Sequence, residues 1–148
     1  MQNAGHGPNI GHGFVKYVLI DRDGTERPPL VFPALIARAD AAIAGALTHI
    51  RSVTLGGVDY WTGEDALYAA APLFSLAQQR LADPTFIPAL MMGALDRLGY
   101  LNGAASGICV SGLPATWASD PTKAQLLGAR IRVATAMFGA GAIRCRGR

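Results

Sequence analysis

The sequence predicts one α/β domain in which a mixed sheet is flanked by helices, in a three-layer arrangement. Three observations lead to this fold class. The chain has 148 residues, the size of one ordinary domain, and 51% of them are hydrophobic, which is enough for a core. Runs of β-branched and aromatic residues alternate with runs at helical spacing. Their order is strand, hairpin, helices, then a strand and a helix, which is typical of α/β domains.

The first two predicted strands lie close together near the N-terminus. Residues 14–20 are β-branched and aromatic, and they run into a turn marked by Asp23 and Gly24. Residues 30–32 form a second, shorter extended run that stops at Pro33. The first sheet is therefore expected to contain at least these two segments.

A hairpin is predicted further along the chain. Residues 51–55 and 58–61 read as strands on either side of Gly56-Gly57, a strong signal for a tight turn. A short helix over 64–71 is expected to follow. Residues 35–48, before the hairpin, are rich in alanine with mixed charge, and they allow either a helix or an irregular insertion.

Two longer helices are predicted in the second half. Asp83 is the expected N-cap of the first, which has apolar residues at helical spacing as far as Gly99. Asp120 followed by proline repeats this start signal, and the second helix is expected to end near Arg130, with a strand over 131–136. Between the helices, residues 108–110 form an apolar run typical of a buried strand.

The distribution of charge argues against nucleic-acid binding. The formal net charge is +3, but all ten acidic residues lie at or before Asp120. Residues 1–129 carry eight basic and ten acidic side chains, a net of −2, so the basicity belongs to the C-terminal end. A phosphate-backbone surface needs basic residues spread over one face. We therefore expect no direct nucleic-acid partner.

The composition also predicts the compartment. The most apolar stretch, residues 30–50, is interrupted by Pro33, Arg38 and Asp40, so no membrane span is expected. The N-terminus has no basic or apolar region typical of a secretory signal. The two cysteines make neither a disulfide framework nor a zinc site. A cytoplasmic location is the resulting prediction, with no metal ligands assigned.

The candidate binding site is the glycine-flanked turn Gly11-His12-Gly13. Such a turn can bring backbone N–H groups close to an anion, and the ammonium of Lys16, three residues on, can neutralise phosphate charge. The turn is not a Walker A loop, which needs Gly-Lys-Ser/Thr at the start of a helix. It also lacks the third glycine of a dinucleotide fingerprint.

Four short segments in this order resemble the actin-like ATPases, in particular the plasmid-segregation (ParM/StbA-type) group. The first is the phosphate loop around the turn, and the others are a Phe-Pro segment, a Tyr-to-Ala turn after a hairpin, and a Gly-Leu-Pro segment after an inner strand. In this sequence they are residues 11–17, Val31-Phe32-Pro33-Ala34, Tyr60-Trp61-Thr62-Gly63-Glu64-Asp65-Ala66 and Ser111-Gly112-Leu113-Pro114.

The resemblance implies the N-terminal lobe of a two-lobed, ribonuclease-H-like fold. It covers residues 9–130 within a lobe of residues 1–136, and it leaves residues 137–148 as an irregular basic tail, a truncated or frameshifted end. ATP and magnesium would lie between the two lobes, and self-association would form filaments that a plasmid-bound adaptor could recruit. The implied ligand-binding residues are Asn9, Gly11, His12, Gly13, Phe14 and Lys16.

Three departures from the family pattern limit the implied chemistry. Asn9 stands where the family has an acidic residue that holds magnesium through water. No Gln, Glu or Asp follows Gln125, although the family uses one to orient the attacking water. The chain is also too short for a second lobe. We therefore assign no catalytic residue and expect no ATP hydrolysis by this chain alone. Two alternatives remain open: a degenerate, non-catalytic actin-like scaffold, and an unrelated small module that binds anions or peptides.

Overall fold

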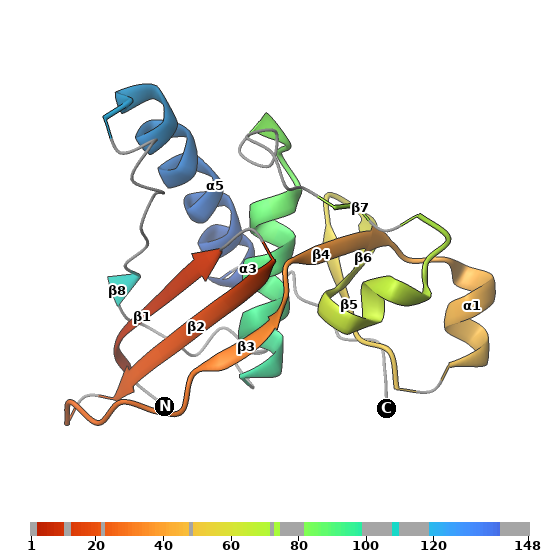
Figure 1. The fold of residues 1–148 in the computed structure, drawn as a ribbon, viewed down its shortest axis with the longest axis horizontal. Helices are drawn as coiled ribbons and strands as arrows, with labels where there is room; N and C mark the ends of the chain where they lie inside the picture. The colour runs from red at the N-terminus through yellow and green to blue at the C-terminus, as the bar shows by residue number, and fades with distance from the viewer. Residues whose placement is uncertain are drawn as a thin grey trace.

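The part of the protein that the structure, a computed structural model, describes contains two four-stranded sheets, two longer helices and two short ones (Figure 1). The described residues are 3–10, 13–21, 23–47, 49–71, 73–74, 82–98, 108–109 and 119–139. The first sheet leads into the predicted phosphate-binding turn. The second sheet forms the other end of the molecule (Figure 1).

The first sheet is mixed, with the strand order β3-β2-β1-β8. Its strands are β1 (Asn3–Ile10), β2 (Phe14–Asp21), β3 (Leu30–Pro33) and β8 (Ile108–Cys109). β2 pairs antiparallel with both β1 and β3, whereas β8 adds parallel to β1. The predicted strands at 14–20, 30–32 and 108–110 are confirmed, except that Val110 lies outside the described residues.

β1 is a strand that the sequence analysis did not predict, because Gly5, Gly7 and Pro8 are poor strand formers. Backbone pairing accounts for it. β1 lies between β2 and β8, and its pairing with β2 extends from Asn3 to Ile10. The glycine-rich N-terminus is therefore a middle strand of the sheet.

The second sheet is antiparallel, with the order β5-β6-β4-β7. Its strands are β4 (Leu35–Arg38), β5 (Ser52–Leu55), β6 (Val58–Thr62) and β7 (Leu73–Phe74). The hairpin of β5 and β6 confirms the prediction. Gly56 and Gly57 have φ values of 58° and 79°, the left-handed conformation that a type I′ turn requires of both central residues.

Of the two alternatives for residues 35–48, the helix is confirmed only over Ala41–Ala46, and Thr48 lies outside the described residues. Residues 35–47 contain the buried strand β4 and, after it, the short helix α1 (Ala41–Ala46). Asp40 is the N-cap of α1, since its Oδ1 accepts a hydrogen bond from the N–H of Ala42 at 2.8 Å. The short helix predicted over 64–71 is a 3-10 helix, η1 (Gly63–Tyr68).

The first long helix, α3 (Phe86–Arg97), begins later than predicted because Thr85, and not Asp83, is its N-cap. Asp83 instead orders the turn before the helix. Its Oδ1 accepts hydrogen bonds from the N–H and the hydroxyl of Thr85, at 2.7 and 2.6 Å. Partial burial raises the pKa of the Asp83 carboxyl, but these hydrogen bonds outweigh that effect, so its pKa is lowered overall.

The second long helix, α5 (Pro121–Gly139), corrects the prediction of a strand over 131–136. Leu127 is buried in the core, and Ile131 packs against the same core one turn later. This spacing continues the apolar stripe of a helix, and packing against α3 prevails over the strand propensity of the β-branched residues. The helix also extends three residues into the range expected to be an irregular tail.

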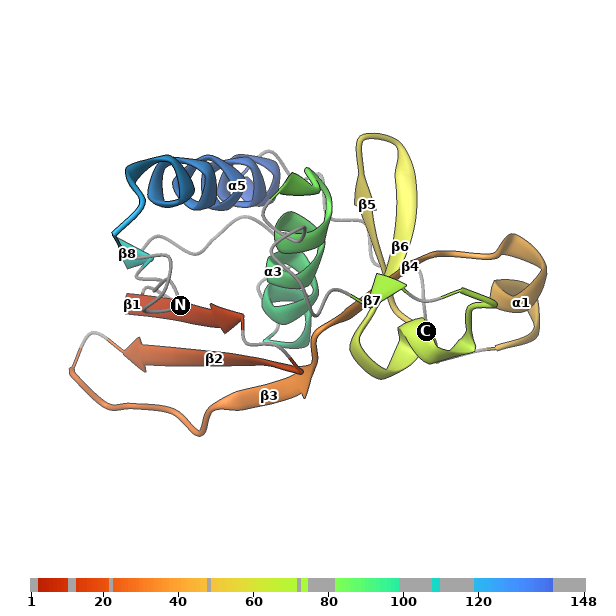
Figure 2. The same cartoon turned by 45° about the horizontal axis from the view of Figure 1, so that its top comes forward.

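The helices α3 and α5 lie on the same face of the first sheet, as Figures 1 and 2 agree. Val15, Tyr17 and Leu19 of β2 point into the core that they cover. The described residues therefore form two layers at this sheet, in place of the three that were predicted. No described helix combines the length and the hydropathy needed to cross a membrane.

Candidate functional site

The predicted phosphate-binding residues lie at the hairpin between β1 and β2. Gly11 and His12 fall outside the described residues, whereas Asn9, Ile10 and the residues from Gly13 onward are described. The register sets Asn9 directly opposite Lys16, and residues paired in this way point to the same face of a sheet. Both residues are exposed. The hairpin thus carries an amide and an ammonium group side by side, next to the predicted turn.

Gly13 has no structural reason to be glycine. Its φ is not positive, and no atom lies within 4 Å of the position that a Cβ would occupy. A larger residue would therefore fit without strain. The missing side chain leaves the backbone open to solvent, which is the condition for close approach of an anion to N–H groups.

The hairpin is joined to the Phe-Pro segment of β3. The N–H of Ala34 donates a hydrogen bond to the carbonyl oxygen of Gly13 at 2.9 Å. Phe14, which is 56% exposed, lies opposite Pro33 in the register of β2 and β3. The first and second segments of the family resemblance are therefore neighbours in space.

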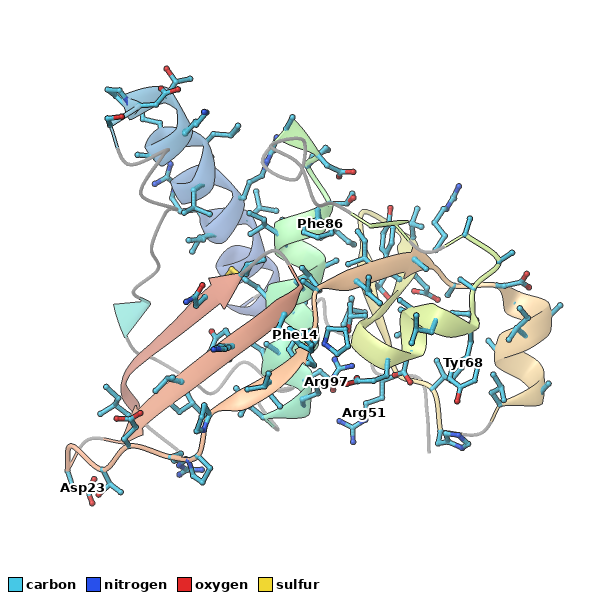
Figure 3. All side chains as sticks on the ribbon, viewed as in Figure 1. Phe14, Asp23, Arg51, Tyr68, Phe86 and Arg97 are labelled. Carbon is cyan, nitrogen blue, oxygen red and sulfur yellow. The ribbon has the colours of Figure 1, made fainter. Side chains whose placement is uncertain are left out.

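The second and third segments meet at Arg97, near the C-terminal end of α3 (Figure 3). Its guanidinium lies 4.4 Å from the ring centre of Phe32 in β3. The Nη1 donates to Thr62 Oγ1 at 2.9 Å and to the carbonyl of Gly93 at 3.1 Å, and the Nη2 donates to the carbonyl of Thr62 at 2.8 Å. Glu64 Oε2 is 3.6 Å from Nη2. We call these five residues the Arg97 cluster.

Two glycines make room for the Arg97 cluster. Gly63 has a φ of 66°, and a Cβ there would lie 2.7 Å from Arg97 Nη2 and 3.0 Å from the Phe32 ring. A Cβ on Gly93 would collide with the side chain of Thr62. The Tyr-to-Ala segment thus needs glycine at position 63 both for its backbone conformation and for this contact.

Charged side chains surround the cluster at the junction of the two sheets. Burial lowers the pKa of Arg97, while Glu64, Asp65 and Asp96 act in the opposite direction. Arg51 Nη1 lies 3.5 Å from Asp96 Oδ2, whose side chain is 1% exposed. The N–H of Arg51 also donates to Asp65 at 3.2 Å. These contacts attach the end of α3 to the start of β5 and to η1.

Sequence reasoning missed Arg97 and Gly93 altogether. Arg97 is separated by 35 residues from Thr62, and it resembles any basic residue in the last turn of a helix. Phe32 and Gly63 share Arg97 as a partner, but the sequence alone does not show which residue that partner is. The fourth segment, Ser111–Pro114, lies outside the described residues. Within the described ranges, no three His, Cys, Asp or Glu side chains are grouped as a metal site.

Comparison with solved structures identifies the fold. AlfA from the B. subtilis plasmid pLS32, in a filament structure, matches 85% of the chain with a TM-score of 0.59 and 16% identity. A non-polymerisable pCBH ParM mutant matches 88% with a TM-score of 0.54 and 17% identity. Bacillus thuringiensis ParM with ADP matches 82% with a TM-score of 0.52 and 17% identity. The chain has an actin-like fold.

These structural neighbours are plasmid-segregation actin-like proteins, as the sequence resemblance suggested. The actin-like fold of this chain spans 46% of the AlfA chain, 38% of the pCBH ParM chain and 36% of the B. thuringiensis ParM chain, less than half of each. No protein-family model and no curated protein sequence matches the chain.

Replacement of Arg97 by lysine should destabilise the protein. Lysine cannot reproduce the forked hydrogen bonds to Thr62, so we expect Arg97→Lys to lower the free energy of unfolding by about 1–3 kcal/mol. Arg38→Lys, at the exposed end of β4, is the matched control. Urea unfolding of both variants tests this, and equal losses would contradict a structural role of the cluster.

The two glycines should respond differently to alanine. Gly63→Ala should cost about 1–2 kcal/mol of stability, because it combines a left-handed φ with a collision at Arg97. Gly13→Ala should change stability by less than about 0.5 kcal/mol, since its surroundings are open. Thermal unfolding of both variants measures the difference, and a comparable loss at Gly13 would mean that packing determines this glycine after all.

Proposed function

We propose that this chain is the N-terminal, nucleotide-binding lobe of an actin-like protein of plasmid segregation. In this proposal the β1–β2 hairpin binds the phosphates of ATP in a cleft shared with a second lobe, and the assembled protein forms filaments in the cytoplasm. The observation that carries the proposal is the Asn9–Lys16 pair beside Gly13, a glycine for which the protein's own packing gives no reason. The mixed order of the first sheet also fits a ribonuclease-H-like subdomain.

The comparisons support parts of this proposal. B. thuringiensis ParM was solved with ADP, and AlfA was solved as a filament. A nucleotide ligand and self-association are therefore reasonable for a chain of the same fold. Recruitment by a plasmid-bound adaptor rests on the family resemblance alone. The unrelated anion- or peptide-binding module is the weakest alternative, because the fold is actin-like.

The residues at the hairpin fit phosphate better than they fit magnesium. Lys16 would hold negative phosphate oxygens, and backbone N–H groups of residues 11–13 would donate hydrogen bonds to them. Asn9 offers magnesium only a neutral oxygen, whereas this hard dication prefers carboxylates. Magnesium would therefore be held chiefly through the nucleotide, where it neutralises phosphate charge.

A degenerate scaffold is the second candidate, and Asn9 is the observation that favours it. Such a protein would keep the lobe's packing, including the Arg97 cluster, without binding a nucleotide. In either case this chain alone should not hydrolyse ATP. Phosphoryl transfer needs groups on both sides of the phosphates and an oriented water, and no Gln, Glu or Asp follows Gln125.

Thermal unfolding with and without millimolar ATP and magnesium tests nucleotide binding. A ligand at a hundred times its Kd stabilises the folded state by about 2.7 kcal/mol, which raises the Tm by several degrees in a domain of this size. Lys16→Ala should weaken ATP binding by about tenfold or more, because it removes the cation at the phosphates. Lys123→Ala, which changes the only other lysine, is the control.

A shift in Tm that Lys16→Ala abolishes and Lys123→Ala preserves would support the proposal. A shift that survives Lys16→Ala would disprove the role of this lysine. No shift in a protein that unfolds cooperatively would favour the scaffold.

Asn9→Asp separates the two candidates further. If the rest of the phosphate loop is intact, restoring a carboxylate next to Lys16 should make nucleotide binding depend on magnesium. Titration of the variant with ATP, with magnesium or with EDTA, measures this. A variant that binds no better than the original chain in magnesium would indicate that the loop has lost its function.

A further inference from the structure

The Asn9–Lys16 pair has neutral neighbours on its face of the first sheet. In the register of the strands, Lys16 lies between Asn9 on β1 and Val31 on β3, and all three residues are exposed. Paired residues share a face of a sheet. The groups directly beside the Lys16 ammonium across the strands are therefore an amide and a hydrocarbon side chain, and neither can neutralise its charge.

Acidic residues are distant from Lys16 along the same face. β1 and β3 contain no acidic residue, and the positions of β2 that share the Lys16 face hold Phe14, Val18 and Ile20. Among the described residues, Glu26 is the first acidic residue at this face, as the bridge partner of Ile20. At about 3.3 Å per residue, Ile20 is roughly 13 Å from Lys16 along the strand. A magnesium ligand must lie about 2 Å from the ion, so Glu26 is too far away to bind an ion at Lys16.

The Arg97 cluster approaches the sheet from the opposite face. Its Phe32 lies opposite Val15 in the register, and both side chains are buried in the core that includes α3. Val15 and Lys16 are neighbours along β2, so their side chains point to opposite faces. The ring of Phe32 and the guanidinium stacked on it therefore lie on the other side of the sheet from the Lys16 ammonium. The carboxylate of Glu64 is directed at that guanidinium, 3.6 Å from its Nη2.

The ten acidic residues of the chain all fall within the described ranges, and all of them are placed away from the hairpin. They belong to the end of β2 away from the hairpin, to the surroundings of Arg97 and Arg51, to the starts of the helices, and to the β5–β6 hairpin. In that order they are Asp21, Asp23 and Glu26; Glu64, Asp65 and Asp96; Asp40, Asp83 and Asp120; and Asp59. The described part of the chain therefore brings no acidic residue to the phosphate-binding hairpin.

Asn9 favours a bare phosphate over a phosphate that carries a metal. Its amide N–H groups can donate hydrogen bonds to phosphate oxygens, as the Lys16 ammonium can. An aspartate at this position would repel those oxygens unless a cation stood between them. Mg²⁺ is a hard dication that prefers carboxylate ligands, and Asn9 offers it one neutral oxygen. The described residues of the hairpin thus fit the anion and do not fit the ion.

We propose that the hairpin binds the metal-free form of the nucleotide, and that magnesium weakens this binding. Because this is the ligand of the same hairpin, the proposal rests on the proposed function. A metal-free nucleotide presents its full negative charge to Lys16 and Asn9. Part of that charge is cancelled when magnesium is bound to the nucleotide, and the described side chains of the hairpin give the ion no carboxylate in return. Magnesium therefore acts as an antagonist at this lobe.

Calorimetric titration of the full chain with ATP tests the effect of magnesium. One solution contains EDTA and the other an excess of magnesium chloride, with potassium chloride added so that the ionic strengths match. The Kd should be lower in EDTA by about threefold or more, because Lys16 then meets the full phosphate charge. Asn9→Asp should reverse this order, since the new carboxylate repels the bare phosphates and can hold the metal. Lys123→Ala, on α5, is the control and should keep the original order.

Equal or tighter binding of ATP in magnesium would overturn this proposal. If Lys16→Ala abolished that binding, the phosphate-binding role of the hairpin would still stand. An absence of binding in both solutions would overturn this proposal and the proposed nucleotide site together. An Asn9→Asp variant that still binds more tightly in EDTA would also contradict the proposal. The comparison of the original chain in the two solutions needs no variant, so it gives a result even if a variant fails to fold.

Discussion

The architecture depends on one largely buried cation, Arg97, whose side chain is 14% exposed. Arg97 holds Phe32 of the first sheet, the end of β6 in the second sheet and its own helix α3 at a single point. A guanidinium can do this because its donors form a planar fork while its face stacks on an aromatic ring. A cation at such a depth is costly unless it is fully hydrogen-bonded, which explains why carbonyl oxygens and Glu64 surround it.

This constraint gives physical meaning to short motifs that otherwise look arbitrary. Phe32 and Gly63 belong to two separate segments of the family resemblance. The Phe32 ring stacks on the guanidinium of Arg97, and the absence of a side chain at Gly63 leaves room for the same guanidinium. Gly13 differs from them, because no contact among the described residues requires it to be glycine. The segments around Arg97 therefore maintain the fold, whereas the hairpin carries a glycine that the described packing does not require.

Local patterns in the sequence predicted most strands and both long helices, because turn glycines, apolar runs and caps act over a few residues. They failed where distant packing decides. β1 is a strand only because β2 and β8 pair with it, and residues 131–136 continue a helix that packs against α3. Lys16 was singled out by its spacing from the glycine-flanked turn and Asn9 by the family resemblance, and the register adds that the two residues are paired. Arg97 could not be found, since its partners are distant in the sequence.

The parallel pairing of β1 with β8 affects how the chain folds. It joins Gly5 to Ile108, so the first sheet is complete only after about a hundred residues have been brought together. The β1–β2–β3 hairpins involve near neighbours and can form early. Until β8 arrives, the glycine-rich strand β1 remains an unprotected edge, open to pairing with other chains. Folding speed, and the risk of aggregation during synthesis, should therefore depend on the addition of β8.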